Sequence, residues 1–231
     1  MTLRERETRL FERWKEERND TSFLPDGVPD ESVWNEQKVK ITFVLKEANW
    51  RDGNADLREF LRNGGDWKTW NNVARWAQAL LAGGAYPRHV SPADRSCWLS
   101  RISFLNLKKA GGGRRASSRE LREYAVRDAA FLREQLSLYA PDLVVCCGWG
   151  IVAGILYQDV LPKESVSAWK KTANGFDFFC AQIAGKNTPV VSFYHPQRVA
   201  SHEVFSGWYE DMKKIGDELL GRRDIITETK G

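Results

Sequence analysis

The sequence has few of the residues from which metal sites and disulfide frameworks are built. Its 231 residues include four cysteines and three histidines. The cysteines, at positions 97, 146, 147 and 180, form no C-x-x-C pair, so their spacing predicts neither a disulfide framework nor a metal site. Cys146 and Cys147 fall in an apolar stretch, where cysteine behaves as a small hydrophobic residue. We therefore expect no metal and no cofactor.

Long hydrophobic runs are absent as well. No stretch approaches the roughly 18 apolar residues that a membrane-spanning helix needs. The first residues, MTLRERETRLFERW, are charged throughout and lack the apolar middle of a signal peptide. We therefore expect a cytoplasmic protein without a membrane partner.

Charge and aromatic content leave more functions open. The net charge of +4 and the isoelectric point near 8.9 permit a nucleic-acid partner without requiring one. Ten tryptophans are many for this length, and we expect some in the core and some available for stacking on a ligand. The length suits one sizeable core. We expect a monomer. We expect a helical extension over 1–37, one domain over 38–222 and a frayed tail over 223–231.

Apolar runs alternate with helical patterns along the chain. Runs rich in β-branched and aromatic residues predict strands at 39–45, 101–107, 142–148 and 190–194, with a hairpin or edge strand at 176–183. Helical spacing predicts helices at 3–18, 66–81, 118–139 and 149–156, and a last one up to about 215. This alternation predicts an α/β fold, a three-layer α/β/α sandwich around a short, mainly parallel four-stranded sheet.

Polar residues and glycines follow each of the four main strands. They are Glu47, Asn49 and Asp52 after the first, Asn106, Lys108 and Lys109 at the second, Gly148 and Gly150 after the third, and His195 after the fourth. Pro196 ends the fourth strand and keeps His195 extended. Because the carboxyl ends of parallel strands meet at one edge of a sheet, we expect these residues to line one cleft.

The order of these segments resembles the uracil-DNA glycosylase superfamily. Its members carry an acidic or amide residue in a G-E-A-P-G-like turn, an Asn near the end of strand two, a P-x-hydrophobic-G third strand and a final H-P-S. The corresponding segments here are KEAN after FVL, ISFLNLKK, PDLVVCCGWG and FYHPQRVAS. The resemblance covers residues 38–220 and implies the same fold, with single- or double-stranded DNA as the partner.

The resemblance also implies catalytic roles. Cleavage of an N-glycosidic bond builds positive charge on the sugar and negative charge on the departing base. The resemblance implies that Glu47, or Asp52 if the turn is threaded differently, orients or deprotonates the attacking water. His195 would hydrogen-bond the departing base as its negative charge develops.

Further residues would recognise the substrate. The resemblance implies that Asn106 and Asn49 contact the target base, while Trp50 stacks on it after it has flipped out of the helix. The DNA contacts would come from Lys108, Lys109, Arg114, Arg115, Gln197 and Arg198.

Three positions depart from the family pattern. Lys46 replaces the Gly that opens the first turn, Asn49 replaces its Pro, and Gln197 replaces the Ser after His-Pro. The cysteines do not match the iron–sulfur ligands of the thermophilic branch.

The expected function is a DNA repair hydrolase that excises uracil or another deaminated base. The alternative is a catalytically inactive nucleic-acid or nucleotide-binding protein on the same fold.

Simpler interpretations stay open for the same residues. Glu47 and Asp52 could be solvated turn residues, and Asn106 could cap a strand end. The basic loop after the second strand could be only a solvated loop, and Trp50 could belong to the core.

A dinucleotide-binding interpretation competes at residues 148–154, where GWGIVAG follows a strand. That strand is the third in the chain rather than the first of a β-α-β unit. The segment about 20 residues further on is Trp-Lys-Lys, with no acidic residue to bind a ribose. The sequence therefore favours the glycosylase resemblance over a nicotinamide site.

Overall fold

The computed structural model describes residues 1–19, 22–50, 55–65, 68–112 and 117–221. The strands are β1 (Ile41–Glu47), β2 (Ser103–Lys108), β3 (Leu143–Cys147), β4 (Lys170–Lys171), β5 (Asp177–Ile183) and β6 (Lys186–Phe193). The helices are α1 (Leu3–Arg18), α2 (Glu31–Glu36), α3 (Leu57–Arg62), α4 (Lys68–Leu81), α5 (Pro92–Leu99), α6 (Ser118–Arg127), α7 (Ala129–Tyr139), α8 (Ile151–Ile155) and α9 (His202–Leu219). A π-helical turn (Leu156–Val160) and a 3₁₀ turn (Lys163–Ser165) follow α8.

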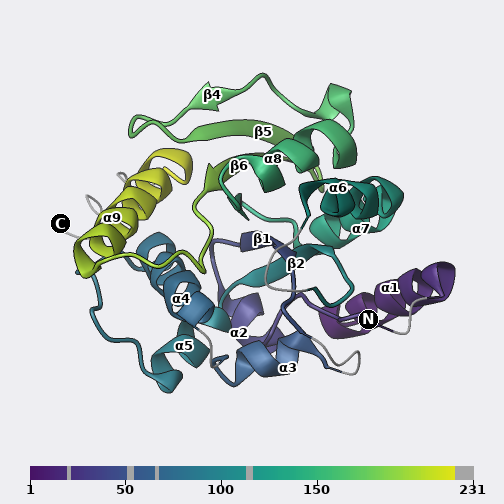
Figure 1. The fold of residues 1–231 in the computed structure, drawn as a ribbon, viewed down its shortest axis with the longest axis horizontal. Coiled ribbons are helices and arrows are strands. Elements are labelled where there is room, and N and C mark those ends of the chain that lie inside the picture. Colours follow the sequence, from purple (N-terminus) through teal and green to yellow (C-terminus); the bar gives the residue numbers. More distant parts are fainter. Residues whose placement is uncertain (20–21, 51–54, 66–67, 113–116, 222–231) are drawn as a thin grey trace.

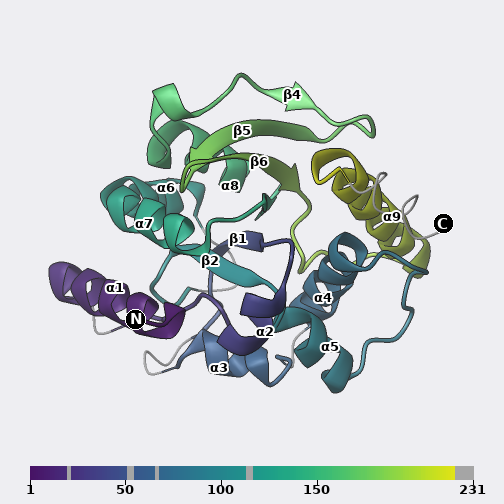
Figure 2. The same ribbon diagram turned by 180° about the vertical axis from the view of Figure 1, so that it is seen from behind.

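All described strands form one mixed sheet in the order β2-β1-β3-β6-β5-β4 (Figures 1 and 2). The first four strands in this order run parallel, whereas β5 and β4 run antiparallel to their neighbours. The predicted α/β class is confirmed. The predicted four-stranded, mainly parallel sheet is wrong, because the sheet has six strands in the described ranges and is mixed. The four strands expected in it are its parallel part.

A tight hairpin adds the antiparallel strands. Ala184 and Gly185 have φ values of 50° and 79°, the positive values that a two-residue hairpin turn requires. β6 therefore begins well before the predicted start at residue 190. Its first residues pair with β5 alone, and pairing with β3 starts at Val190. Pro189, which cannot donate a hydrogen bond, thus lies where β6 has only one neighbouring strand.

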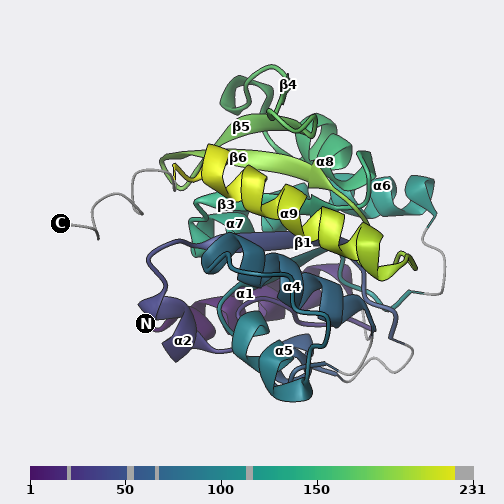
Figure 3. The same cartoon turned by 90° about the vertical axis from the view of Figure 1, so that its left-hand side faces the viewer.

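Apolar side chains pack on both faces of the sheet. α4, α5 and α9 cover one face, where Trp76 and Tyr209 are buried. α1, α6, α7 and α8 cover the other face, where Trp14 and Leu132 are buried. Figure 1 shows the two helical layers on opposite sides of the strands, and Figure 3 shows α9 lying across the first of these faces next to α4.

Polar residues set the ends of the helices. Thr2 and Glu5 form a reciprocal capping box at the start of α1, as the predicted helix at 3–18 requires. The helix predicted at 118–139 is two helices, because the chain bends at Asp128, whose buried carboxylate pairs with Arg18 of α1. None of the described helices combines the length and apolar character needed to cross a bilayer.

The segment between α1 and α2 covers the free edge of β2. The Leu24 amide donates to the Lys109 carbonyl at 2.6 Å, and the Phe104 amide donates to the Gly27 carbonyl at 3.0 Å. An uncovered edge strand would leave such groups free to pair with another chain. This segment therefore closes one end of the sheet.

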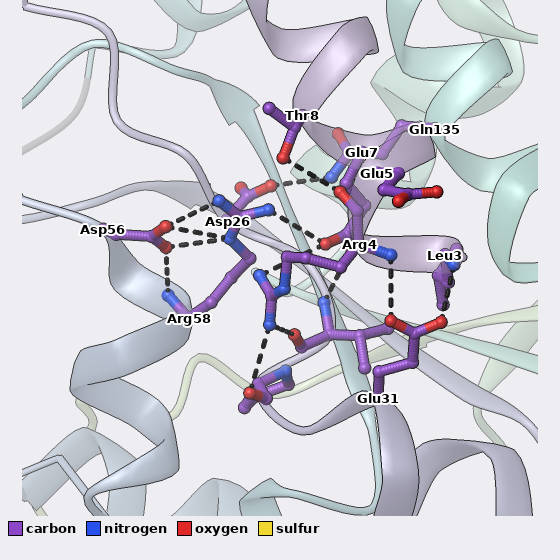
Figure 4. Close-up of polar contacts among 12 residues, drawn as sticks. Leu3, Arg4, Glu5, Glu7, Thr8, Asp26, Glu31, Asp56, Arg58 and Gln135 are labelled. Carbon is purple, nitrogen blue, oxygen red and sulfur yellow. Dashed lines mark hydrogen bonds and ion pairs between the residues drawn. The ribbon is translucent and has the colours of Figure 1, made fainter. Parts of the chain in front are cut away.

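A buried carboxylate holds that segment in place. Asp26 accepts hydrogen bonds from Lys109 Nζ (2.5 Å), from the backbone and side-chain amides of Asn106 (2.6 and 3.0 Å) and from Gln135 of α7 (2.7 Å). Figure 4 shows Asp26 beside Gln135. Burial lowers the pKa of Lys109 even though Asp26 acts in the opposite direction. The cluster thus joins the segment after α1 to both β2 and α7.

A second buried carboxylate, Glu7 of α1, lies nearby. It accepts hydrogen bonds from the Val28 amide and the Tyr139 hydroxyl, both at 2.9 Å, and from the Arg58 guanidinium at 3.0 Å. Burial raises the pKa of Glu7 more than the Val28 amide and the Arg58 and Arg4 charges lower it. Figure 4 shows Arg58 between Glu7 and Asp56. The contacts of Glu7 therefore hold α1 in place in addition to its apolar packing.

Removal of Asp26 would leave the Lys109 ammonium buried without its counter-ion. We expect Asp26→Ala to lower the free energy of unfolding by about 3–5 kcal/mol, the cost of breaking a buried ion pair. The exposed pair Lys171–Asp177 (2.7 Å) supplies a control, because Asp177→Ala should cost less than about 1 kcal/mol. Urea unfolding followed by tryptophan fluorescence measures both. Equal losses would contradict the role given to Asp26.

Candidate functional site

The parallel strands bring their carboxyl ends to one edge of the sheet. From β1 the chain crosses to β2 on one side, and it later adds β3 and β6 on the other side. Open α/β sheets bind ligands at such a reversal, outside the carboxyl ends of the strands. Lys46 and Glu47, at the end of β1, and His195, just past β6, lie at these ends.

Glu47 lies opposite Lys108 of β2 in the strand register. The Lys108 ammonium is 3.1 Å from the Glu47 carboxylate and 2.6 Å from that of Glu120 on α6. Burial lowers the pKa of Lys108, but the two carboxylates outweigh burial, so the pKa is raised above its ordinary value. Lys108 is therefore a cation shared by two carboxylates at the edge of the sheet.

The loop after β2 closes over Glu47. The Gly112 amide donates to the Ala48 carbonyl at 2.8 Å, and a side chain at Gly112 would overlap the Glu47 carboxylate. Any other residue at position 112 would therefore displace the Glu47 carboxylate. The Glu47 side chain is only 8% exposed, so Glu47 is an enclosed, ion-paired carboxylate rather than a solvated turn residue.

His195 is half-buried and neutral. The Gln197 backbone amide donates to His195 Nδ1 at 3.3 Å, which leaves Nε2 as the nitrogen that carries the proton. Burial, and after it the positive charge of Lys46, lowers the pKa of His195 to about 4. The turn is fixed from α4, since Asn72 donates to the Pro196 carbonyl at 2.7 Å. His195 thus presents a hydrogen-bond donor without carrying a charge.

Lys46 is the site residue that the sequence prediction missed. It is the residue of β1 whose charge acts on His195, whereas the contacts described for Glu47 run to Lys108 and the Gly112 loop. Lys46 lies beside Gly148, where an added Cβ would lie 2.8 Å from Val152 Cγ2 and 3.2 Å from Lys46 Cε. Alternation along β1 was the available signal, since neighbouring residues of a strand face opposite sides.

Three predicted site residues lie inside the protein. Lys108, predicted to bind DNA, is 7% exposed and paired with Glu47 and Glu120. Asn106, predicted to contact the base, is 5% exposed and bonded to Asp26 through its backbone and side chain. Lys109, predicted to bind DNA, is 2% exposed, pairs with Asp26 and lies 5.1 Å from the centre of the Trp14 ring. None of the three side chains offers its polar group at the surface.

Of the remaining described candidates, Asn49, Gln197 and Arg198 are exposed at the rim, and Trp50 is half-buried. Asn49 is exposed after β1, and Trp50 packs edge-on against Phe60 with ring centres 5.3 Å apart. Gln197 and Arg198 are exposed after His195, and the neighbouring Val199 is 84% exposed. Asp52, Arg114 and Arg115 fall outside the described residues.

The loop at residues 148–151 bonds its amides within the protein. The Gly148 and Trp149 amides donate to the Phe193 carbonyl at 3.1 and 2.9 Å, and the Gly150 amide donates to the Ser192 hydroxyl at 2.8 Å. A dinucleotide fingerprint needs such amides free for the pyrophosphate. The loop therefore lacks the open cradle that a nicotinamide cofactor requires.

Within the described ranges, no three His, Cys, Asp or Glu side chains lie close enough to hold a metal ion.

No model of a protein family matches the chain, and no curated protein matches it. The likeness to the uracil-DNA glycosylases therefore rests on the order of the sequence segments, and its functional content is a proposal.

Titration tests the state of His195. We expect NMR to show its imidazole neutral down to about pH 4, with the signal identified by its loss in His195→Gln. Lys46→Met should raise this pKa only in part, because burial, the larger cause, is unchanged. Lys163→Met, on the 3₁₀ turn, is the matched control and should leave it unchanged. A His195 that protonates near its ordinary pKa of 6.5 would contradict the described environment.

The same shift sets a pH dependence of stability. Between about pH 6.5 and 4 the unfolded chain binds a proton at His195 that the folded chain does not. The contribution of His195 to the free energy of unfolding therefore falls as the pH falls through this window, and is constant above it. Urea unfolding across this range should show a shallower pH dependence for His195→Gln, and an unchanged slope would contradict the shift.

Proposed function

We propose that the protein excises uracil or another deaminated base from DNA by hydrolysing the N-glycosidic bond of a flipped-out nucleotide. The observation that carries this proposal is His195, a neutral imidazole with Nε2 as its donor, at the carboxyl edge of the parallel strands. The order of the sequence segments supports the same reaction.

The chemistry assigns one role to each half of the site. The glycosidic bond breaks with its electron pair on the base, and water adds to the sugar and loses a proton. His195 Nε2–H donates to the base oxygen on which negative charge develops, where a preorganised donor is most effective. The Lys46 charge beside His195 stabilises the same anion.

Glu47, or Asp52, would orient the attacking water and accept its proton. Lys108 and the Gly112 loop hold the Glu47 carboxylate, so a water bound to it would attack the sugar from one fixed direction. The base and the water would then approach from different strand ends.

A second candidate function is a nucleic-acid or nucleotide-binding protein without catalysis. The enclosure of Glu47 favours it, because an ion-paired carboxylate that is 8% exposed has little contact with water. A binding protein needs no activated water, only cations at its rim. Exposed Arg198 would then bind phosphates, and the same role is proposed for Arg114 and Arg115.

A base-release assay distinguishes the two functions. Single- and double-stranded oligonucleotides carrying uracil, hypoxanthine or xanthine would be incubated with the protein, and abasic sites detected as alkali-labile cleavage. His195→Gln should slow release by about 10²–10³-fold, because the departing base loses its donor. Glu47→Gln should slow it by about 10²–10⁴-fold, because the water loses its base.

Matched controls use the same residue types at exposed positions. His89→Gln, in the connection between α4 and α5, and Glu12→Gln, on α1, should leave the rate unchanged. Base release that survives both site variants would overturn the assigned roles. Salt-sensitive binding of all oligonucleotides without any release would favour the binding protein.

A further inference from the structure

Trp149 occupies an unusual position for a large aromatic residue. It follows β3 with its side chain 64% exposed, and its φ of 50° lies in the left-handed region that bulky residues rarely adopt. Its amide bond to the Phe193 carbonyl and the Gly150 bond to Ser192 hold the loop in this shape. The loop therefore holds the Trp149 indole in an exposed position, where packing in the core does not explain a large aromatic residue.

Trp149 is the outer member of a stack of aromatic rings. Its ring lies on Tyr194 with centres 4.8 Å apart and planes 22° apart, and Tyr194 lies on Trp208 of α9 at 4.6 Å and 27°. Phe176 packs edge-on against Tyr194 at 5.6 Å. The stack and the fixed backbone limit the movement of the indole, so its outward face is a preorganised flat surface.

The stack adjoins the candidate site. Tyr194 directly precedes His195, and Lys46 lies against Gly148, the residue before Trp149. A nucleotide whose base contacts His195 would therefore have a neighbour in the same strand close to the indole.

A recess beside the indole has the size and lining of a ligand site. Its volume is about 450 Å³, within the range of small-molecule sites, and Trp149, Tyr194 and Phe176 form its apolar part. Ser192 and Asn174 add polar groups to its lining. An aromatic wall with a few polar groups suits a heterocyclic base.

Charges of both signs flank this surface: Asp211 acts on Tyr194, and the cations lie around it. Lys46 lies on one side of the loop, and Arg198 is exposed with its guanidinium 5.8 Å from the Trp208 ring. Lys171 lines the recess and is partnered there by Asp177 at 2.7 Å. The cations suit a phosphate backbone that passes the stack.

We propose that the outward face of Trp149 stacks on a nucleobase of single-stranded nucleic acid, next to the base held at His195. An unpaired base offers a free π face to an aromatic ring, whereas both faces of a paired base are covered in a duplex. The flat ring and its flanking cations match a base with its phosphate better than an apolar protein surface. The inference rests on the proposed function in taking nucleic acid as the ligand and in placing a base at His195.

Binding of undamaged DNA tests this site without base release. Anisotropy of a labelled oligothymidylate of about 12 nucleotides measures affinity for wild type, Trp149→Phe and Trp149→Leu. Trp149→Leu should weaken binding by about 5- to 100-fold, and Trp149→Phe less, because a smaller ring stays available. The salt dependence should be unchanged, since no charge is removed. The duplex of the same sequence should bind all three proteins alike.

Trp169→Leu is the matched control, because Trp169 is also partly exposed but packs on Tyr157 and Phe179. A measurement on wild type avoids any folding defect: replacing single thymidines by abasic residues should weaken binding at one position most. Equal binding by wild type and Trp149→Leu would overturn the proposal, as would equal losses for the single strand and the duplex. Self-association of wild type that Trp149→Leu abolishes would assign the indole to a second copy of the chain instead.

These outcomes separate the stacking site from the glycosylase reaction. Trp149-dependent binding without base release leaves the inference standing and removes the enzyme. Base release with Trp149-independent binding does the reverse.

Discussion

The pairing of Asp26 with Lys109 is the constraint on which the arrangement of the sheet edge depends. A carboxylate and an ammonium can leave water together only if each satisfies the other and nearby donors fill the remaining positions. Asn106 and Gln135 provide those donors, so one carboxylate joins the segment after α1, β2 and α7. Lys108 precedes Lys109, and the strand end that buries one lysine against Asp26 therefore directs the other to Glu47.

Alternation along β1 divides the candidate site into two halves. Successive side chains of a strand point to opposite faces, so Glu47 meets Lys108 while Lys46 meets Gly148 and acts on His195. Each half combines one ionisable group with a lysine. A substrate that uses both halves has to extend across the end of β1, which favours a ligand larger than a free base.

The sequence predicted the parts of the fold that follow from apolar patterning. The four parallel strands and α1, α4 and α9 were located from runs and stripes of apolar residues, whereas β4 is two lysines with no pattern to detect. Buried charges were the main failure. The sequence patterns singled out neither Asp26 nor Glu7, because their partners lie far away in the sequence: 80 residues separate Asp26 from Asn106, and 132 separate Glu7 from Tyr139. The strand-end positions of Glu47 and His195 were foreseen, but their partners were not, for the same reason.

The hydrogen bond that fixes the His195 ring has a consequence for which substitutions the site tolerates. Its donor is the backbone N–H of residue 197, a group that every amino acid except proline supplies. The glutamine found where the resembled pattern has serine therefore leaves the imidazole in the same tautomer. The side chain at position 197 can therefore vary with the ligand at the rim. The tautomer of His195 does not change with it, because the backbone N–H of residue 197 sets that tautomer.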